Sequence, residues 1–82
     1  MNTYRHSFTS ECPVNKALIK YQLLIRTPGI VMVEELVEEC ANVGSDYHEA
    51  IADRLHIKFG NYQKLKAEHH GVVIKTTRGV KS

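Results

Sequence analysis

The sequence predicts one α+β domain spanning residues 1–82, in which two β-hairpins flank a pair of helices in the order β-β-α-α-β-β. Residues 17–26 and 62–78 alternate between apolar and polar side chains, with the period of two that is typical of half-buried strands. Residues 33–40 instead repeat at helical spacing. We therefore expect a mostly antiparallel sheet with both helices on one face, which leaves the other face and the edges uncovered.

The chain length limits what one copy can build. A chain of 82 residues buries only about 60–65% of its unfolded surface, so a closed ligand pocket is difficult to form from one subunit. The hydrophobic fraction of 43% and the charged fraction of 24% are ordinary for a globular domain. Bare sheet edges favour aggregation unless other strands pair with them. We therefore expect a homo-oligomer that closes into a barrel, with sites at its subunit interfaces.

The first hairpin is predicted from two alternating segments. In residues 3–9 the even-numbered Tyr, His and Phe fall on one side. Pro13 has no N–H group and interrupts any ladder at its position. In residues 17–26 the odd-numbered residues form one apolar face, which predicts a half-buried strand. They are Ala17, Ile19, Tyr21, Leu23 and Ile25. The Thr-Pro-Gly sequence at 27–29 predicts the turn that ends this strand.

Residues 33–40 predict an amphipathic helix that ends near Gly44. Its apolar residues are spaced i, i+3, i+4 and i+7, and the glutamates lie mostly away from them. These apolar residues are Val33, Leu36, Val37 and Cys40. Cys40 therefore belongs to the predicted core, and we expect no chemical role for it.

Residues 45–60 predict a second helix that ends at Gly60. Ser45 or Asp46 is expected to cap its N-terminus. With Asp46 as the cap, Glu49 occupies the third helical position and completes a capping box. This gives Glu49 a structural role that competes with any role in binding.

Residues 62–78 predict the second hairpin, with a turn or bulge at 68–71. The apolar pattern leaves the register of the two strands open. Leu65 and Ala67 are expected to lie against Val73, or else against Val72 and Ile74.

Charge is unevenly distributed along the chain. Residues 34–53 carry seven acids and no Lys or Arg, whereas six basic residues and one acid follow from Lys58 onward. Solvated helix faces beside an exposed hairpin explain this pattern, and so does a basic surface for a phosphate-bearing ligand. Aromatic residues do not alternate with the basic ones as single-strand binding requires, so nucleic acid is an unlikely partner.

The apolar segments are too short for membrane insertion. The longest apolar run covers residues 30–33, far fewer than a bilayer-spanning helix needs, and the N-terminus has no apolar core of the signal-peptide kind. We expect a cytoplasmic protein with no membrane partner, in which both cysteines are free thiols. Cys12 differs from Cys40 because it directly precedes Pro13, between two strands. A reactive thiol and a small buried hydrophobe are both open interpretations of Cys12.

Three sequence blocks in order carry a resemblance to a known family. They are "FTSECPV" at 8–14, "MVEEL" at 32–36 and "SDYHEAIADRL" at 45–55. The chain resembles the 7-cyano-7-deazaguanine reductases of queuosine biosynthesis, which belong to the tunnelling-fold superfamily of purine- and pterin-binding enzymes. The resemblance covers residues 8 to about 76.

This resemblance implies an enzyme with a covalent mechanism. Cys12 would attack the nitrile of the substrate to give a thioimide. We expect His48, or a histidine of a neighbouring subunit, to accept the thiol proton. The pair His48 and Glu49, together with Glu34, would bind the purine-like base, because carboxylates accept hydrogen bonds from its N–H groups.

The resemblance also implies NADPH as the cofactor, although its binding residues are not matched. The family segment after the Val-Glu pair is rich in Ser and Lys, whereas this chain has Glu35, Glu38 and Glu39 there. The family's general acid, an Asp seven positions after the Cys, is replaced by Ile19. Reductive chemistry and an amidino-transfer type of chemistry on a deazapurine are both compatible with the nucleophile.

The C-terminal segment "KAEHHGVVIKTTRGV" at 66–80 is similar to the end of GTP cyclohydrolase I, which holds a catalytic zinc. This similarity implies an alternative, in which Cys12, His69 and His70 bind a metal with one open position. A non-catalytic base-binding protein and a purely structural oligomer are the other two alternatives.

Overall fold

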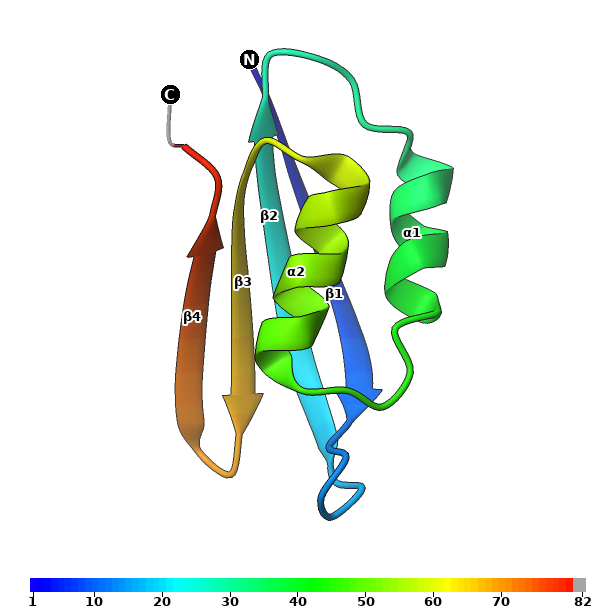
Figure 1. The fold of residues 1–82 in the computed structure, drawn as a ribbon, viewed down its shortest axis with the longest axis vertical. Coiled ribbons are helices and arrows are strands. Elements are labelled where there is room, and N and C mark those ends of the chain that lie inside the picture. The colour runs from blue at the N-terminus through cyan, green and yellow to red at the C-terminus, as the bar shows by residue number, and fades with distance from the viewer. Residues whose placement is uncertain (81–82) are drawn as a thin grey trace.

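Four antiparallel strands form one sheet in chain order, β1-β2-β3-β4, in the computed structural model, which describes residues 1–80. The strands are β1 (Asn2–Glu11), β2 (Leu18–Thr27), β3 (Tyr62–His69) and β4 (Val72–Arg78), and the helices are α1 (Val33–Ala41) and α2 (His48–Phe59). Both helices cover the same face of the sheet (Figure 1). The predicted β-β-α-α-β-β order and the α+β class are therefore confirmed.

The strand register settles the arrangement that the sequence left open. Ala67 pairs with Ile74 across β3 and β4, so the second of the two predicted registers is present. Tyr21 pairs with Phe8 on one side and with Ala67 on the other. Directly opposed residues point to the same face, so these four residues form one row across the helix-covered side of the sheet.

The core lies between the sheet and the two helices. It contains Ile19, Tyr21, Leu23 and Ile25 of the predicted apolar face, whereas Ala17 precedes β2 and is only partly buried. The most enclosed core side chains are Tyr21, Leu23, Ile25, Cys40, Ile51, Leu55, Leu65 and Ala67. The prediction that Cys40 is a packed core residue is confirmed, because its side chain is 1% exposed.

The prediction for the apolar stripe of α1 is only half correct. Leu36 and Cys40 are buried, but Val33 is 55% exposed and Val37 is 45% exposed. α1 contacts β1 at the edge of the sheet. A helix in that position presents only one row of side chains to the sheet, so the outer half of the stripe stays in solvent.

The predicted capping box of α2 is wrong. The helix begins at His48 after Tyr47, and no side chain caps it. The Asp46 carboxylate instead accepts a hydrogen bond from the N–H of Tyr47 at 2.8 Å. Glu49 is thus the second residue of the helix, one position too early for a capping box. Gly60 follows the helix with φ +61, and this predicted end is confirmed.

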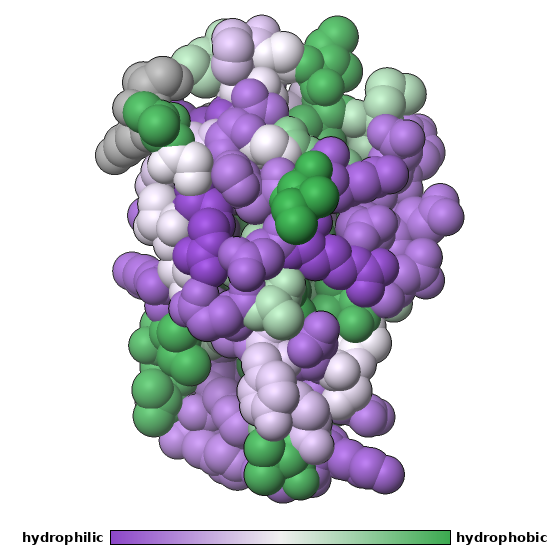
Figure 2. Space-filling model, viewed as in Figure 1, coloured by the Kyte–Doolittle hydropathy of each residue, from purple (hydrophilic) through white to green (hydrophobic). Residues whose placement is uncertain are grey.

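The other face of the sheet carries no helix and is rich in basic side chains. Alternation along the paired strands places six basic residues on this face: Arg5, Lys20, Arg26, Lys64, Lys66 and Lys75. The helix-covered side is largely hydrophilic, with small separate hydrophobic patches (Figure 2).

Within residues 1–80, neither helix is long and apolar enough to cross a membrane.

Candidate functional site

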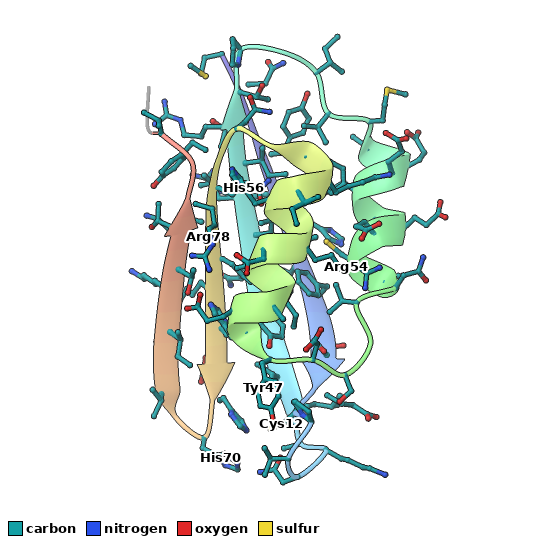
Figure 3. The ribbon with its side chains drawn as sticks, viewed as in Figure 1. Cys12, Tyr47, Arg54, His56, His70 and Arg78 are labelled. Carbon is teal, nitrogen blue, oxygen red and sulfur yellow. The ribbon has the colours of Figure 1, made fainter. Side chains whose placement is uncertain are left out.

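A pocket of about 180 Å³ opens at the end of the sheet where β1 leads into β2. The β1–β2 loop, the α1–α2 loop and the β3–β4 turn meet at this end, and Cys12, Tyr47 and His70 gather there (Figure 3). The pocket is lined by Cys12, Pro13, Ile19, Tyr21, Asp46, Tyr47, His48, Ala67, His69 and Ile74. We call it the Cys12 pocket. It brings together three of the predicted site residues: Cys12, His48 and, from the alternative metal site, His69.

The backbone of a tight loop holds Cys12 in place. Its N–H donates to the carbonyl oxygen of Ala17, and its carbonyl oxygen accepts from the N–H of Lys16, both at 2.8 Å. Asn15 closes the loop further, because its side-chain oxygen accepts from the N–H of Ala17 at 3.0 Å. Cys12 is 7% exposed, so its thiol is enclosed and also lies against a pocket.

His48 enters the pocket as the first residue of α2. Its Nε2 lies 2.7 Å from the Thr76 hydroxyl oxygen of β4. Burial lowers the pKa of His48, Glu49 acts in the opposite direction, and Arg78 lowers it further. The imidazole is therefore neutral at neutral pH and is able to accept a proton.

Tyr21 forms the floor of the pocket. Its ring stacks on Phe8, with ring centres 5.1 Å apart, and on His48, with ring centres 5.8 Å apart. Burial raises the pKa of Tyr21, and the neighbouring Cys12 and Asp46 raise it further. The sequence placed Tyr21 on the buried face of its strand, but no motif indicated a role in a site.

Unpaired polar atoms are concentrated at this pocket. Within residues 1–80, the buried side-chain polar atoms without a hydrogen-bond partner are the Tyr21 hydroxyl, Nδ1 of His48 and Nε2 of His69. All three residues line the Cys12 pocket. Buried polar groups are normally hydrogen-bonded, and leaving them unpaired reduces stability. Their convergence beside a thiol indicates a site for a polar ligand.

The two predicted substrate-binding glutamates lie outside the pocket. Glu49 is adjacent to His48, but its side chain is 70% exposed and pairs with Arg78 of β4. Arg78 also pairs with Asp53, at 3.0 Å. Glu34 is exposed in the first turn of α1, at the opposite end of the sheet from Cys12 (Figure 1). One chain alone therefore does not bring either glutamate to the thiol.

The alternative metal ligands are also not assembled by one chain. Across residues 1–80, no group of three or more His, Cys, Asp or Glu side chains is arranged to hold a metal ion. His70 packs on His69, with ring centres 4.2 Å apart, and its Nε2 lies 3.3 Å from the side-chain nitrogen of Asn15. Cys12 and His69 line the pocket, but His70 does not.

The surface of α1 does not fit the phosphates of NADPH. Glu34 and Glu35 lie in its first turn, and Glu35, Glu38 and Glu39 surround a shallow depression with Lys58. Glu39 is paired with Arg54 at 2.5 Å. A diphosphate at this surface would meet more negative than positive charge, which is unfavourable.

The architecture is that of a tunnelling-fold unit, with a four-stranded antiparallel sheet and two helices on one face. A solved structure with the same fold is the crystal structure of the archaeosine synthase QueF-Like in the apo form. The TM-score is 0.67 at 18% sequence identity, and the match covers 98% of this chain and 95% of that chain. No protein-family model matches the chain, and no curated protein sequence does.

Proposed function

We propose that this chain is an enzyme that binds a purine-like base carrying a nitrile, 7-cyano-7-deazaguanine or a derivative, and attacks the nitrile with Cys12. The Cys12 pocket carries the proposal, because the thiol shares it with His48 and with the three unpaired polar atoms. The likeness to an archaeosine synthase over 98% of the chain supports a related activity.

The proposed step forms a covalent thioimide. A thiolate is the nucleophilic form of cysteine, so Cys12 first gives its proton to Nδ1 of His48. This nitrogen has no partner within residues 1–80, and the lowered pKa of His48 keeps it unprotonated. Sγ then bonds to the nitrile carbon, one C–N π bond breaks, and the nitrogen takes up a proton. The activity extends to this thioimide and includes no step that uses NADPH, because the α1 surface does not fit it.

Base binding in this proposal requires a second subunit. The volume of about 180 Å³ is below the roughly 300 Å³ at which ligand pockets usually begin. On ligand binding, the Glu49 carboxylate leaves its ion pair with Arg78 and accepts hydrogen bonds from the N–H groups of the base. Glu34 reaches the site from a neighbouring copy. Charge-assisted hydrogen bonds of this kind are stronger than neutral ones.

The test is adduct formation with 7-cyano-7-deazaguanine in the absence of a reductant. The parent protein is expected to gain the mass of the ligand and the absorbance of a thioimide. Cys12→Ala abolishes both signals. Cys40→Ala is the matched control, because Cys40 is also buried, lies outside the pocket and has a pKa that burial raises to about 11. The proposal fails if the parent forms no adduct. Alkylation of Cys12 by iodoacetamide no faster than that of Cys40 would then show that Cys12 is a structural residue.

A further inference from the structure

Tyr21 is buried, and its hydroxyl makes no hydrogen bond within residues 1–80. Its side chain is 1% exposed. Tyr4 shows the usual arrangement, because its hydroxyl accepts a hydrogen bond from the N–H of Val31 at 3.1 Å. A phenylalanine would stack equally well between Phe8 and His48 without burying an unpaired hydroxyl. Packing alone therefore does not account for the hydroxyl.

The other polar side chains that line the pocket differ from Tyr21. Tyr47 also carries a phenol, but it is 62% exposed, and His69 is a base. The Asp46 carboxylate accepts from the N–H of Tyr47, and His48 is neutral and serves as a proton acceptor. Ile19 lies two residues before Tyr21 on the same face of β2 and offers no proton. Tyr21 is close enough to Cys12 and Asp46 for their charges to raise its pKa. Its phenol therefore stays protonated at neutral pH and remains a donor.

We propose that Tyr21 donates its hydroxyl proton to the nitrile nitrogen of the substrate as Cys12 attacks the nitrile carbon, an assignment that rests on the proposed function. The bond between Sγ and the carbon forms, and the electron pair of one C–N π bond moves to the nitrogen, which takes the proton of Tyr21. The imidazolium of His48, which holds the former thiol proton, then reprotonates the phenolate. Thiol and nitrile thus give a neutral thioimide with no net gain or loss of protons.

The rings of Tyr21 and His48 lie side by side in the pocket. They stack at 5.8 Å between centres with an interplanar angle of 25°, and both residues line the Cys12 pocket. The Tyr21 hydroxyl and Nδ1 of His48 have no hydrogen-bond partner within residues 1–80, so each is free to bond to a ligand in the pocket that also contains Cys12. Acid–base catalysis needs such groups within hydrogen-bond reach of the reacting atoms once the substrate is bound.

The experiment compares Tyr21→Phe with the parent in adduct formation with 7-cyano-7-deazaguanine. At saturating nitrile, the rate constant of adduct formation is expected to be lower in Tyr21→Phe than in the parent by a factor of at least about 100, which is the scale of losing a general acid. Affinity for the nitrile, measured in a Cys12→Ala background where no adduct forms, stays unchanged. The melting temperature of Tyr21→Phe stays equal or rises, because an unpaired buried hydroxyl is removed. Tyr62→Phe is the control, since Tyr62 is buried but does not line the pocket.

Each outcome decides the question. If the parent forms the adduct and Tyr21→Phe forms it at the same rate, the assignment of Tyr21 is overturned while the proposed function stands. If the parent forms no adduct, both are overturned. Loss of folding in Tyr21→Phe would overturn the assignment too, because the hydroxyl would then serve the structure.

Discussion

Glu49 and Asp53 share one partner and differ in their surroundings. Both pair with Arg78, and their side chains are 70% and 61% exposed. Exposed ion pairs contribute about 0–1 kcal/mol, so neither carboxylate is strongly committed to Arg78. Only Glu49 directly follows the pocket residue His48. The two residues therefore allow a ligand-binding role to be separated from a structural one.

Glu49→Gln is expected to lower the free energy of unfolding by less than about 1 kcal/mol and to weaken binding of 7-cyano-7-deazaguanine by about 1.5–3 kcal/mol. The loss in binding is the scale of a hydrogen bond to a charged group. Calorimetry in a Cys12→Ala background measures the affinity, and urea unfolding measures the stability. Asp53→Asn removes the other partner of Arg78 and should leave the affinity unchanged. Equal affinities in the parent and Glu49→Gln would leave Glu49 with only its ion pair.

His48 should make stability depend on pH. Burial lowers its pKa below the ordinary value of 6.5, so the unfolded chain binds this proton at a higher pH than the folded chain does. Stability contributed by neutral His48 is therefore present above the unfolded pKa and decreases as the pH falls toward the folded pKa. Urea midpoints between about pH 7.5 and about pH 5 should fall in the parent and fall less in His48→Gln. Parallel curves for the two proteins would show that His48 is not the group responsible.

At the scale of elements, the end of β4 depends on one glycine. Gly79 has φ +84, and a Cβ at this position would run into the backbone of Asn61 and Tyr62. Gly71 in the β3–β4 turn has a similar φ of +79, but nothing lies within 4 Å of its Cβ position. The two glycines therefore share a backbone conformation and differ in the space around them.

Gly79→Ala is expected to destabilise the chain by about 3–4 kcal/mol, because both the positive φ and the clash oppose the new methyl group. Gly71→Ala is the matched control and should cost only about 1–2 kcal/mol, the penalty for an L-residue at positive φ. Urea unfolding of the two variants measures both values. A similar cost at both positions would mean that the strand moves away from Asn61 easily.

The elements were predictable because their signals are local, and the site was not. Alternation in β2 and helical spacing in α1 are set by which face meets the core, so the order and type of the elements followed from the sequence. The cap of α2 was not predictable, because Asp46 has several N–H groups within reach and bonds that of Tyr47. The two resemblances indicated Cys12, His48 and, as an alternative metal ligand, His69, whereas Tyr21 joins them only through strand pairing.

At the scale of the whole molecule, charge and sheet edges favour self-association. The uncovered face carries six basic residues, while the first turn of α1 is acidic. β1 and β4 each have one edge that no strand of the same chain covers, within the part of the chain that the structure describes. Unpaired edges are normally blocked or used for assembly.

We expect a cyclic oligomer, or two stacked rings, with the Cys12 pocket near a subunit boundary. Light scattering at micromolar concentration should report a mass several times that of the 9.3 kDa chain. Adduct formation should fall when the assembly is dissociated by dilution, because the neighbouring copy then no longer completes the site. A monodisperse monomer with full reactivity would contradict this prediction.

The layout of the connections has a consequence for engineering. Three of them, residues 12–17, 42–47 and 70–71, meet at the Cys12 end, and the other two lie at the opposite end (Figure 1). Each strand pairs only with its neighbours along the chain, so the strand order does not depend on long crossovers, although Cys12 and Val43 of these segments also belong to the core. Tyr21, His48 and His69 lie in the adjoining strands and helix, so a graft that transplants the recognition properties should include these three residues together with the three segments.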